Sequence, residues 1–322
     1  MTDRPSATER RELLFRVADA DFRVVFHGSE DRRPLIDSCY PFFQRYGSTG
    51  EPPIFTLDVD DSLLTPEPEG TELGQFDCGG INHGVYRFDE RAGGGYKIVI
   101  GSTGGAASCA LRANADFSRC TASLFGDAAS QAFGLGNALM LCFSFAGAYH
   151  DILLIHASVP MLAGSGYPCL GVSGTGKSTH RRNWERYIPG VEMLNDDNPA
   201  LRVVGDDIYI YGTPWSGKTP CYRNVRQRLG GFIRLEQAPA NELQRLSKLQ
   251  TFVSILNSAS TMMWDKPSYD RITATCSRIA ESVPAVHLKN LPDREAVLLS
   301  YRALVLGLWP GDERSVETPS EA

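Results

Sequence analysis

Short runs of β-branched and aromatic residues alternate with Gly, Pro and Asp through the first 125 residues. Runs of this kind, bounded by turn residues, predict β-strands. The last two of them flank Asp-Glu-Arg-Ala-Gly-Gly-Gly, which predicts a hairpin whose glycines take positive φ. We therefore expect a mostly β N-terminal domain over residues 1–125, to which no motif assigns a role. Its clearest strands are expected at 23–26, 54–57, 85–88 and 96–100.

The next segment, residues 132–149, is apolar for about the length of a membrane-spanning helix. It contains glycines and the polar residues Asn137 and Ser144, and no Lys or Arg flanks it. Apolar segments with such polar breaks usually pack inside proteins. We therefore expect a buried helix over residues 126–149, at the junction of two domains, and no membrane span.

Short strands and helices alternate from residue 150 onward, which predicts a second domain over residues 150–310. Residues 311–322 are polar, and we expect a disordered tail there. The predicted fold class is therefore α/β (α+β), with a smaller mostly β domain first. The expected strands are 152–155, 169–172, 191–194, a hairpin of 201–204 with 208–211, and 286–288. The expected helices are 178–187, 240–263, 268–282 and one from Pro292 to about 308.

The composition is that of an ordinary globular protein. Hydrophobic residues make up 42% of the 322 residues and charged residues 22%, which excludes a fibrous or fully disordered chain. The formal net charge is −6, so the chain has no generally basic surface. We therefore expect neither a nucleic-acid nor a membrane partner.

Eight cysteines are scattered along the chain without a Cys-x-x-Cys pair. Structural zinc sites need closely spaced ligands and disulfide scaffolds need dense cysteines, so we expect neither. The first residues are polar and lack the apolar core of a signal peptide. These features favour reduced thiols and a cytoplasmic protein.

One segment, Gly171-Val-Ser-Gly-Thr-Gly-Lys-Ser178, matches the motif G-x-x-x-x-G-K-[ST] in full. Glycines let the backbone wrap around a phosphate, so that N–H groups and the start of the next helix point at the anion. Lys177 would bring positive charge to the β- and γ-phosphates, and the Ser178 hydroxyl can ligate Mg²⁺. The strand expected before the loop and the helix expected after it favour a nucleotide site over a glycine turn without a ligand.

A pair of carboxylates, Asp196 and Asp197, follows the strand expected at 191–194. Adjacent residues of a strand point in different directions, so one can hold metal while the other accepts a proton. Phosphoryl transfer needs both functions. Alone, Leu-Asn-Asp-Asp would more often be a solvated turn, but together with the glycine loop it favours a catalytic pair.

His156 closes the strand expected just before that of the glycine loop. A single histidine at a strand end is more often a packing residue than a ligand or a base. Neighbouring parallel strands, however, place their ends on the same rim, where ligands of open α/β sheets bind. Both interpretations stay open.

A second loop, Gly212-Thr-Pro-Trp-Ser-Gly-Lys218, offers Trp215 and Lys218 for contact with a nucleotide or a substrate phosphate. A β-turn with solvated cations is the alternative. Arginines follow that could clamp an anion: Arg223, Arg226 and Arg228.

These segments resemble, in their order, the superfamily of HPr kinase/phosphorylase and ATP-dependent phosphoenolpyruvate carboxykinase. The resemblance covers residues 150–310 and implies a P-loop domain on a mixed, strongly curved sheet. The chain is too short for the large N-terminal domain of a carboxykinase, and the 212–218 loop replaces the HPr kinase signature. The resemblance therefore favours the HPr-kinase-like proteins. The segments are Ile155-His-Ala-Ser158, the 171–179 loop, Leu-Asn-Asp-Asp (194–197) and the 212–218 loop.

The resemblance also implies roles for individual residues. Asp196, His156 and Lys177 would be catalytic, with Asp196 accepting the proton of a hydroxyl. Ser178 and Asp197 would hold Mg²⁺ or Mn²⁺. The residues that would bind ATP are Ser173, Gly174, Thr175, Gly176, Lys177, Ser178, Thr179 and Lys218.

The expected function is that of an ATP- and Mg²⁺-dependent kinase acting on a hydroxyl, such as a serine of a protein, a peptide or a free amino acid. Two alternatives stay open. One is a carboxykinase-like lyase in which His156 and Lys218 hold Mn²⁺ and a carboxylate substrate, and the other is a non-catalytic module gated by ATP. The expected partners are a nucleotide and a hydroxyl-bearing acceptor, and a homo-oligomer is compatible with the sequence.

Overall fold

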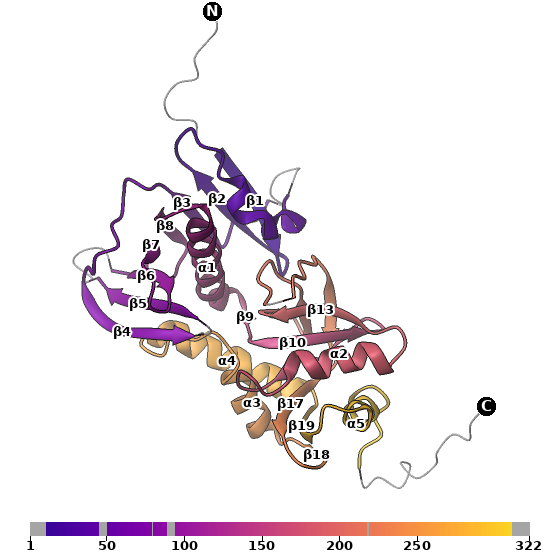
Figure 1. Cartoon of the computed structure of the whole chain (residues 1–322). Helices are drawn as coiled ribbons and strands as arrows, with labels where there is room; N and C mark the ends of the chain where they lie inside the picture. The colour runs from indigo at the N-terminus through magenta and orange to yellow at the C-terminus, as the bar shows by residue number, and fades with distance from the viewer. Residues whose placement is uncertain (1–10, 45–49, 79, 89–93, 218, 311–322) are drawn as a thin grey trace, which may run out of the picture. The chain divides into compact units, whose positions relative to one another are not determined.

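The computed structural model describes residues 11–44, 50–78, 80–88, 94–217 and 219–310 (Figure 1). The described chain is a mixed α/β protein that contains two mixed β-sheets. It divides into two compact units. Of the described residues, the first unit contains those within 11–150 and 261–269, and the second those within 151–260 and 270–310. The expected domains were continuous, whereas a short segment of the second half belongs to the first unit.

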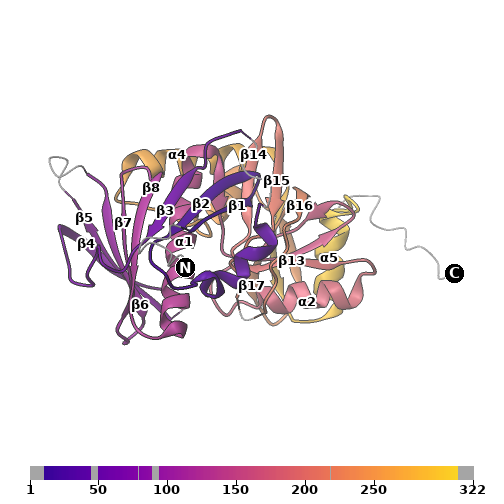
Figure 2. The ribbon, with the colours of Figure 1, turned by 90° about the horizontal axis from the view of Figure 1, so that it is seen from above.

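The first unit is built on an eight-stranded sheet with the order β1-β2-β3-β8-β7-β6-β5-β4 (Figure 2). Strands β2, β3 and β8 are parallel, and the other neighbours are antiparallel. The hairpin expected from the glycine-rich sequence forms between β5 and β6, and Gly94 and Gly95 have positive φ. The strands are β1 (Arg11–Val17), β2 (Ala20–Phe26), β3 (Phe55–Val59), β4 (Thr71–Cys78), β5 (Ile81–Arg87), β6 (Tyr96–Ser102), β7 (Ala107–Ala113) and β8 (Arg119–Leu124).

Helix α1 (Ala128–Gly147) forms where the apolar segment predicted it, capped by the Asp127 side chain. It packs against β3, β6, β7, β8 and the 3-10 helix η1 (Arg33–Phe42). By length and composition, Ala128–His150 could cross a membrane, but most of this segment is buried inside the structure. The segment ends in the 3-10 turn η3 (Ala148–His150).

The second unit has an eleven-stranded sheet with the order β18-β19-β17-β12-β10-β11-β16-β15-β14-β9, and β13 pairs with β10. The strands are β9 (Ile152–Leu154), β10 (Ala157–Leu162), β11 (Ser165–Gly166), β12 (Cys169–Leu170), β13 (Glu192–Asp197), β14 (Ala200–Val204), β15 (Asp207–Tyr211), β16 (Arg226–Leu229), β17 (Phe232–Gln237), β18 (Glu242–Arg245) and β19 (Ala285–Asn290). The helices are α2 (Lys177–Tyr187), α3 (Lys248–Leu256), α4 (Lys266–Ser282), which begins in the first unit, and α5 (Arg294–Leu304).

Trp184 of α2 is fully buried in the core of the second unit, with Ile233, Val286 and Val297 from β17, β19 and α5. Its Nε1 donates to Ser300 Oγ at 3.1 Å and also lies 3.2 Å from His180 Nε2. These contacts fix α2 against α5. Because the glycine loop ends at α2, they also fix the base of that loop.

The helix expected at 240–263 is partly wrong. Residues Glu242–Arg245 form strand β18, which pairs with β19, and α3 begins later, at Lys248. Ser247 caps α3 through a capping box with Gln250, which explains where the helix starts. The predicted disordered tail at 311–322 lies outside the described residues.

Candidate functional site

The glycine loop leads from β12, which ends at Leu170, into α2, which begins at Lys177. Gly171, Gly174 and Gly176 have φ values of 149°, 86° and 95°. Residues with a side chain rarely adopt such values, so the glycines allow the backbone to turn in this way. The strand, loop and helix therefore occur in the order that the motif predicted.

The start of α2 offers backbone donors to an anion. Gly176 is the N-cap residue, and no side chain caps the helix. A Cβ built on Gly174 or Gly176 would meet no atom within 4 Å, so the loop borders open space. Backbone N–H groups at an uncapped helix N-terminus attract negative charge. Ser173 is exposed and Ser178 and Thr179 are half-buried, so this end of the loop is accessible to a phosphate.

Hydrogen bonds inside the loop maintain its shape. Thr175 Oγ1 donates to the carbonyl oxygen of Val172 at 2.8 Å. Gln237 Nε2, from β17, donates to the carbonyl oxygen of Gly174 at 3.0 Å. A Cβ on Gly171 would lie 2.6 Å from Thr175 Oγ1, so a larger residue would displace this contact.

Lys177 folds back over the loop. Its Nζ donates to the carbonyl oxygens of Gly171 at 2.8 Å and of Val172 at 3.2 Å. Burial lowers the pKa of Lys177, while the negative charges of Asp197 and Asp196 act in the opposite direction. The ammonium group is therefore held where it interacts with both the loop and the carboxylate pair.

Asp196 and Asp197 end strand β13 and have different surroundings. Asp196 is 6% exposed, Ser158 Oγ donates to its Oδ1 at 2.6 Å, and Arg181 Nη2 lies 3.9 Å from its Oδ2. Asp197 is half-buried and accepts a hydrogen bond from Asn198 Nδ2 at 2.9 Å. The buried carboxylate is thus held by protein groups, whereas the other is partly open to solvent.

His156 is brought to this carboxylate pair. It lies in the break between β9 and β10, where its backbone N–H donates to the carbonyl oxygen of Ser258 at 2.7 Å. Its Nδ1 is 3.0 Å from Asp197 Oδ1, and its side chain is 48% exposed. This contact orients the imidazole ring and leaves Nε2 for another partner.

The geometric reason expected for this placement is wrong. Strand β9, which His156 follows, pairs antiparallel with β14 and is not a neighbour of β12, and β10, which follows His156, runs antiparallel to β12 and to β13. His156 reaches the carboxylates because β10 begins where β13 ends, with Ala157 opposite Asp197. Strands β10 and β13 and helix α2 lie side by side (Figure 1).

The second loop forms hydrogen bonds with the backbone of the segment that carries the two carboxylates. The Gly217 N–H donates to the backbone oxygen of Asp196 at 3.0 Å, and a Cβ on Gly217 would lie 2.8 Å from that oxygen. Thr213 Oγ1 donates to the backbone oxygen of Asn198 at 2.6 Å. Lys218, expected to contact the nucleotide, lies outside the described residues.

The three arginines after this loop each have a partner on the protein. Arg223 pairs with Glu192 at 2.6 Å, and Arg228 pairs with Asp207 at 2.7 Å. The Arg226 guanidinium lies 4.6 Å from the centre of the Tyr209 ring. These contacts favour the interpretation of solvated surface cations over that of an anion clamp.

Sequence reasoning missed the residues that hold the carboxylate pair. Asn195 Oδ1 accepts from the Asp197 N–H at 2.9 Å, and its Nδ2 lies 3.2 Å from Thr213 Oγ1. Ser158 and Arg181 hold Asp196, as described above. Ser158 lies two residues after His156, so the alternation of a strand was a signal for its contact, but nothing in the sequence pointed to Arg181.

The described residues contain no group of three or more His, Cys, Asp and Glu side chains that could hold a metal ion by themselves. Mg²⁺ needs no such group, because one or two protein oxygens and the phosphates of a nucleotide complete its shell with water. Ser178 at the start of α2 and Asp197 at the end of β13 provide oxygens of this kind. The donors fit Mg²⁺ better than zinc, which prefers nitrogen and sulfur ligands.

No protein-family model matches the chain, and no curated protein matches it significantly. The geometry of the site therefore carries the functional argument.

Proposed function

We propose that the second unit is an ATP- and Mg²⁺-dependent kinase that transfers the γ-phosphoryl group to a hydroxyl, such as a serine of a protein, a peptide or a free amino acid. One observation carries this proposal. Ser158 of β10 is opposite Asp196 of β13 and also opposite Cys169 of β12, the strand that leads into the glycine loop, and Asp197 contacts His156. Phosphoryl transfer requires a phosphate cradle, a cation and a proton acceptor at one place.

The loop would bind the triphosphate through its backbone N–H groups and the start of α2. Lys177 would exchange its bonds to the carbonyl oxygens of Gly171 and Val172 for bonds to phosphate oxygens. The carbonyl contacts place the ammonium at the loop, where the phosphates are proposed to bind. Preorganised charge of this kind stabilises the transition state without further rearrangement.

Mg²⁺, when bound, would neutralise phosphate charge, and Ser178 Oγ and the Asp197 carboxylate are the protein groups proposed to hold it. Asp196 was expected to accept the proton of the attacking hydroxyl. Its burial and its contacts with Ser158 and Arg181 favour a supporting role instead. We propose instead that His156 accepts this proton, because Asp197 contacts its Nδ1 and orients the imidazole ring.

The test is transfer of label from [γ-³²P]ATP to components of a lysate of the source organism, followed by identification of the labelled species. Lys177→Ala should weaken ATP affinity by about tenfold or more and lower transfer by about a hundredfold or more. Lys248→Ala is the matched control, because this lysine is exposed at the start of α3 and donates to a backbone oxygen of the α4 end.

His156→Gln and Asp197→Asn should lower transfer by a similar factor while ATP still binds. Unchanged transfer in Lys177→Ala would remove the proposal. Tight ATP binding without transfer to any acceptor would instead favour a nucleotide-gated module, and consumption of ATP dependent on oxaloacetate would favour a lyase.

A further inference from the structure

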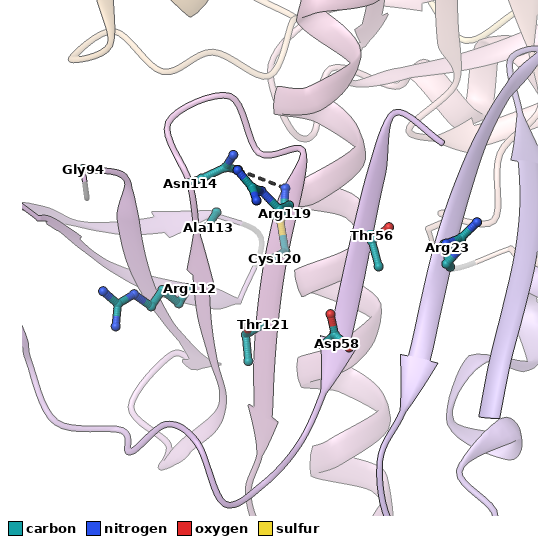
Figure 3. A pocket seen from close by; sticks show the side chains of 10 residues that line it. All are labelled: Arg23, Thr56, Asp58, Gly94, Arg112, Ala113, Asn114, Arg119, Cys120 and Thr121. Atoms are coloured by element: carbon teal, nitrogen blue, oxygen red, sulfur yellow. Dashed lines mark hydrogen bonds between the residues drawn. The ribbon is translucent and has the colours of Figure 1, made fainter. Parts of the chain in front are cut away.

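A pocket of about 660 Å³ lies on the face of the first unit's sheet that points away from α1 (Figure 3). Along β3, Phe55, Leu57 and Val59 are fully buried, whereas Thr56 and Asp58 are half-buried. Because side chains alternate along a strand, the buried set faces the core and the polar set faces the pocket. The volume is in the range of sites for small molecules.

The strand register arranges the polar side chains of the pocket in two rows. In the first row Arg23 is opposite Thr56, and Thr56 is opposite Arg119, across β2, β3 and β8. In the second row Asp58 is opposite Thr121, and Thr121 is opposite Arg112, across β3, β8 and β7. The register also makes Arg112 and Arg119 diagonal neighbours on one face of the sheet, a separation that long side chains can span.

The two diagonal arginines have no acidic partner among the residues that the structure describes. The Arg112 guanidinium lies 4.2 Å from the centre of the Phe88 ring, a contact that fixes the plane of the guanidinium but supplies no negative charge. The turn before Arg119 is fixed because the Arg119 N–H donates to Asn114 Oδ1 at 2.9 Å. The third arginine differs, since Arg23 pairs with Glu12 at 2.8 Å.

Acceptor groups lie in the same pocket. Asp58 Oδ1 is 2.7 Å from His27 Nε2, so this carboxylate is held in place, and no residue that the structure describes forms a hydrogen bond with its other oxygen. Two hydroxyls lie near Asp58 in the pocket: that of Thr56 in the first row and that of Thr121 in the second. A ligand that is complementary to this pocket therefore carries an anionic group, which would pair with Arg112 and Arg119, and a hydrogen-bond donor, which would bind the Asp58 carboxylate.

We propose that this face of the first unit binds a small molecule that carries an oxyanion, either phosphate or carboxylate, together with an ammonium or hydroxyl donor. Arg112 and Arg119 bind the oxyanion, and Asp58 accepts from the donor. Arginine suits this role because its planar donors match two oxygens of such a group. The site is separate from the glycine loop, and the inference does not rest on the kinase proposal.

The experiment measures binding by isothermal titration calorimetry to the full chain carrying Lys177→Ala, which limits phosphate binding at the glycine loop. Inorganic phosphate, succinate and O-phospho-L-serine are the probes. Phosphate and succinate distinguish the two oxyanions, and phosphoserine adds an ammonium donor. We expect saturable binding, with phosphoserine bound more tightly than phosphate.

Adding Arg119→Gln or Arg112→Gln should weaken binding by about tenfold or more, because each removes a charge-assisted pair of hydrogen bonds. Asp58→Asn should remove the preference for phosphoserine over phosphate. Arg33→Gln is the matched control, since this exposed arginine of the same unit pairs with Asp31 outside the pocket, and affinity should not change. Absence of saturable binding by every probe, or affinity unaffected by both pocket arginine variants, would overturn the inference.

Discussion

At the scale of single side chains, burial lowers the pKa values of two polar residues of helix α2, His180 and Lys177. His180 of α2 is 1% exposed and contacts Ser300 and Trp184, and burial lowers its pKa from the ordinary 6.5 to about 4. Lys177, on the same helix, has its pKa lowered by burial as well, although the aspartates oppose this. The helix that begins at the glycine loop therefore carries one neutral histidine inside and one ammonium at its start.

The lowered pKa of His180 predicts a pH dependence of stability. Below pH 6.5 the unfolded chain binds a proton at this position, but the folded chain does so only near pH 4. The free energy of unfolding should therefore fall as the pH decreases from about 6.5 to about 4, by about 3 kcal/mol over the whole range. Urea unfolding at a series of pH values measures this change.

The control for this prediction is His180→Gln, which keeps an acceptor near Trp184 Nε1 but does not titrate. Its stability should depend less steeply on pH between 7 and 5 than that of the unaltered chain. Other groups, such as the partly buried His83, titrate equally in both proteins, so the difference between the two slopes isolates His180. Identical slopes would show that the burial of this histidine does not affect stability in that range.

At the scale of elements, helix α1 depends on close approach to the sheet as well as on hydrophobic burial. Gly134 faces β7, and a Cβ at this position would lie 2.7 Å from the carbonyl oxygen of Ser108 and 2.8 Å from the Cβ of Cys109. Gly136, on another side of the helix, would meet no atom within 4 Å. Close packing against β7 therefore excludes a side chain at Gly134, whereas the surroundings of Gly136 leave room for one.

This difference predicts opposite effects of the same substitution. Gly134→Ala should destabilise the protein by about 1–3 kcal/mol, because the helix must move away from the strand. Gly136→Ala should leave stability unchanged or raise it by up to about 1 kcal/mol, since alanine favours helix. Chemical denaturation of both variants tests the packing, and a Gly134→Ala protein as stable as the original would contradict it.

At the scale of the whole molecule, the first unit includes a segment that is far away in sequence. Trp264 stacks on Phe76 of β4 with ring centres 4.8 Å apart, and its carbonyl oxygen accepts from Arg87. Tyr96 Oη donates to Asp265 Oδ1 at 2.7 Å. The first unit is therefore completed by residues 261–269, and its stability depends on a part of the chain that follows most of the second unit.

Trp264→Ala should therefore lower hydrogen-exchange protection in β4, β5 and β6, with a loss of about 2 kcal/mol in that region. Protection of α2 in the second unit should change much less. Met263→Ala is the neighbouring control, because the Met263 side chain is 72% exposed. Mass spectrometry of exchanged peptides measures both, and equal effects in the two units or none in β4–β6 would refute the prediction.

The sequence by itself predicted those features that depend on local residues. Three glycines, a lysine and a serine in fixed order produce the loop between β12 and α2, because the required backbone angles belong to glycine itself. The apolar segment formed α1, because a long apolar segment must be buried. Strand β16, with the sequence Arg-Gln-Arg-Leu, was missed, since it forms through pairing with β15 and β11 rather than through its own composition.

Tertiary structure alone decided which of these residues meet. Antiparallel pairing of β10 with β13 brings His156 to Asp197, and the same pairing buries Asp196 against Ser158. Strand register likewise places Arg112 diagonally to Arg119 on one face of the first sheet. The residue types were visible in the chain, but their neighbours depend on pairing between strands that are separated by loops and helices, and local sequence does not encode that pairing.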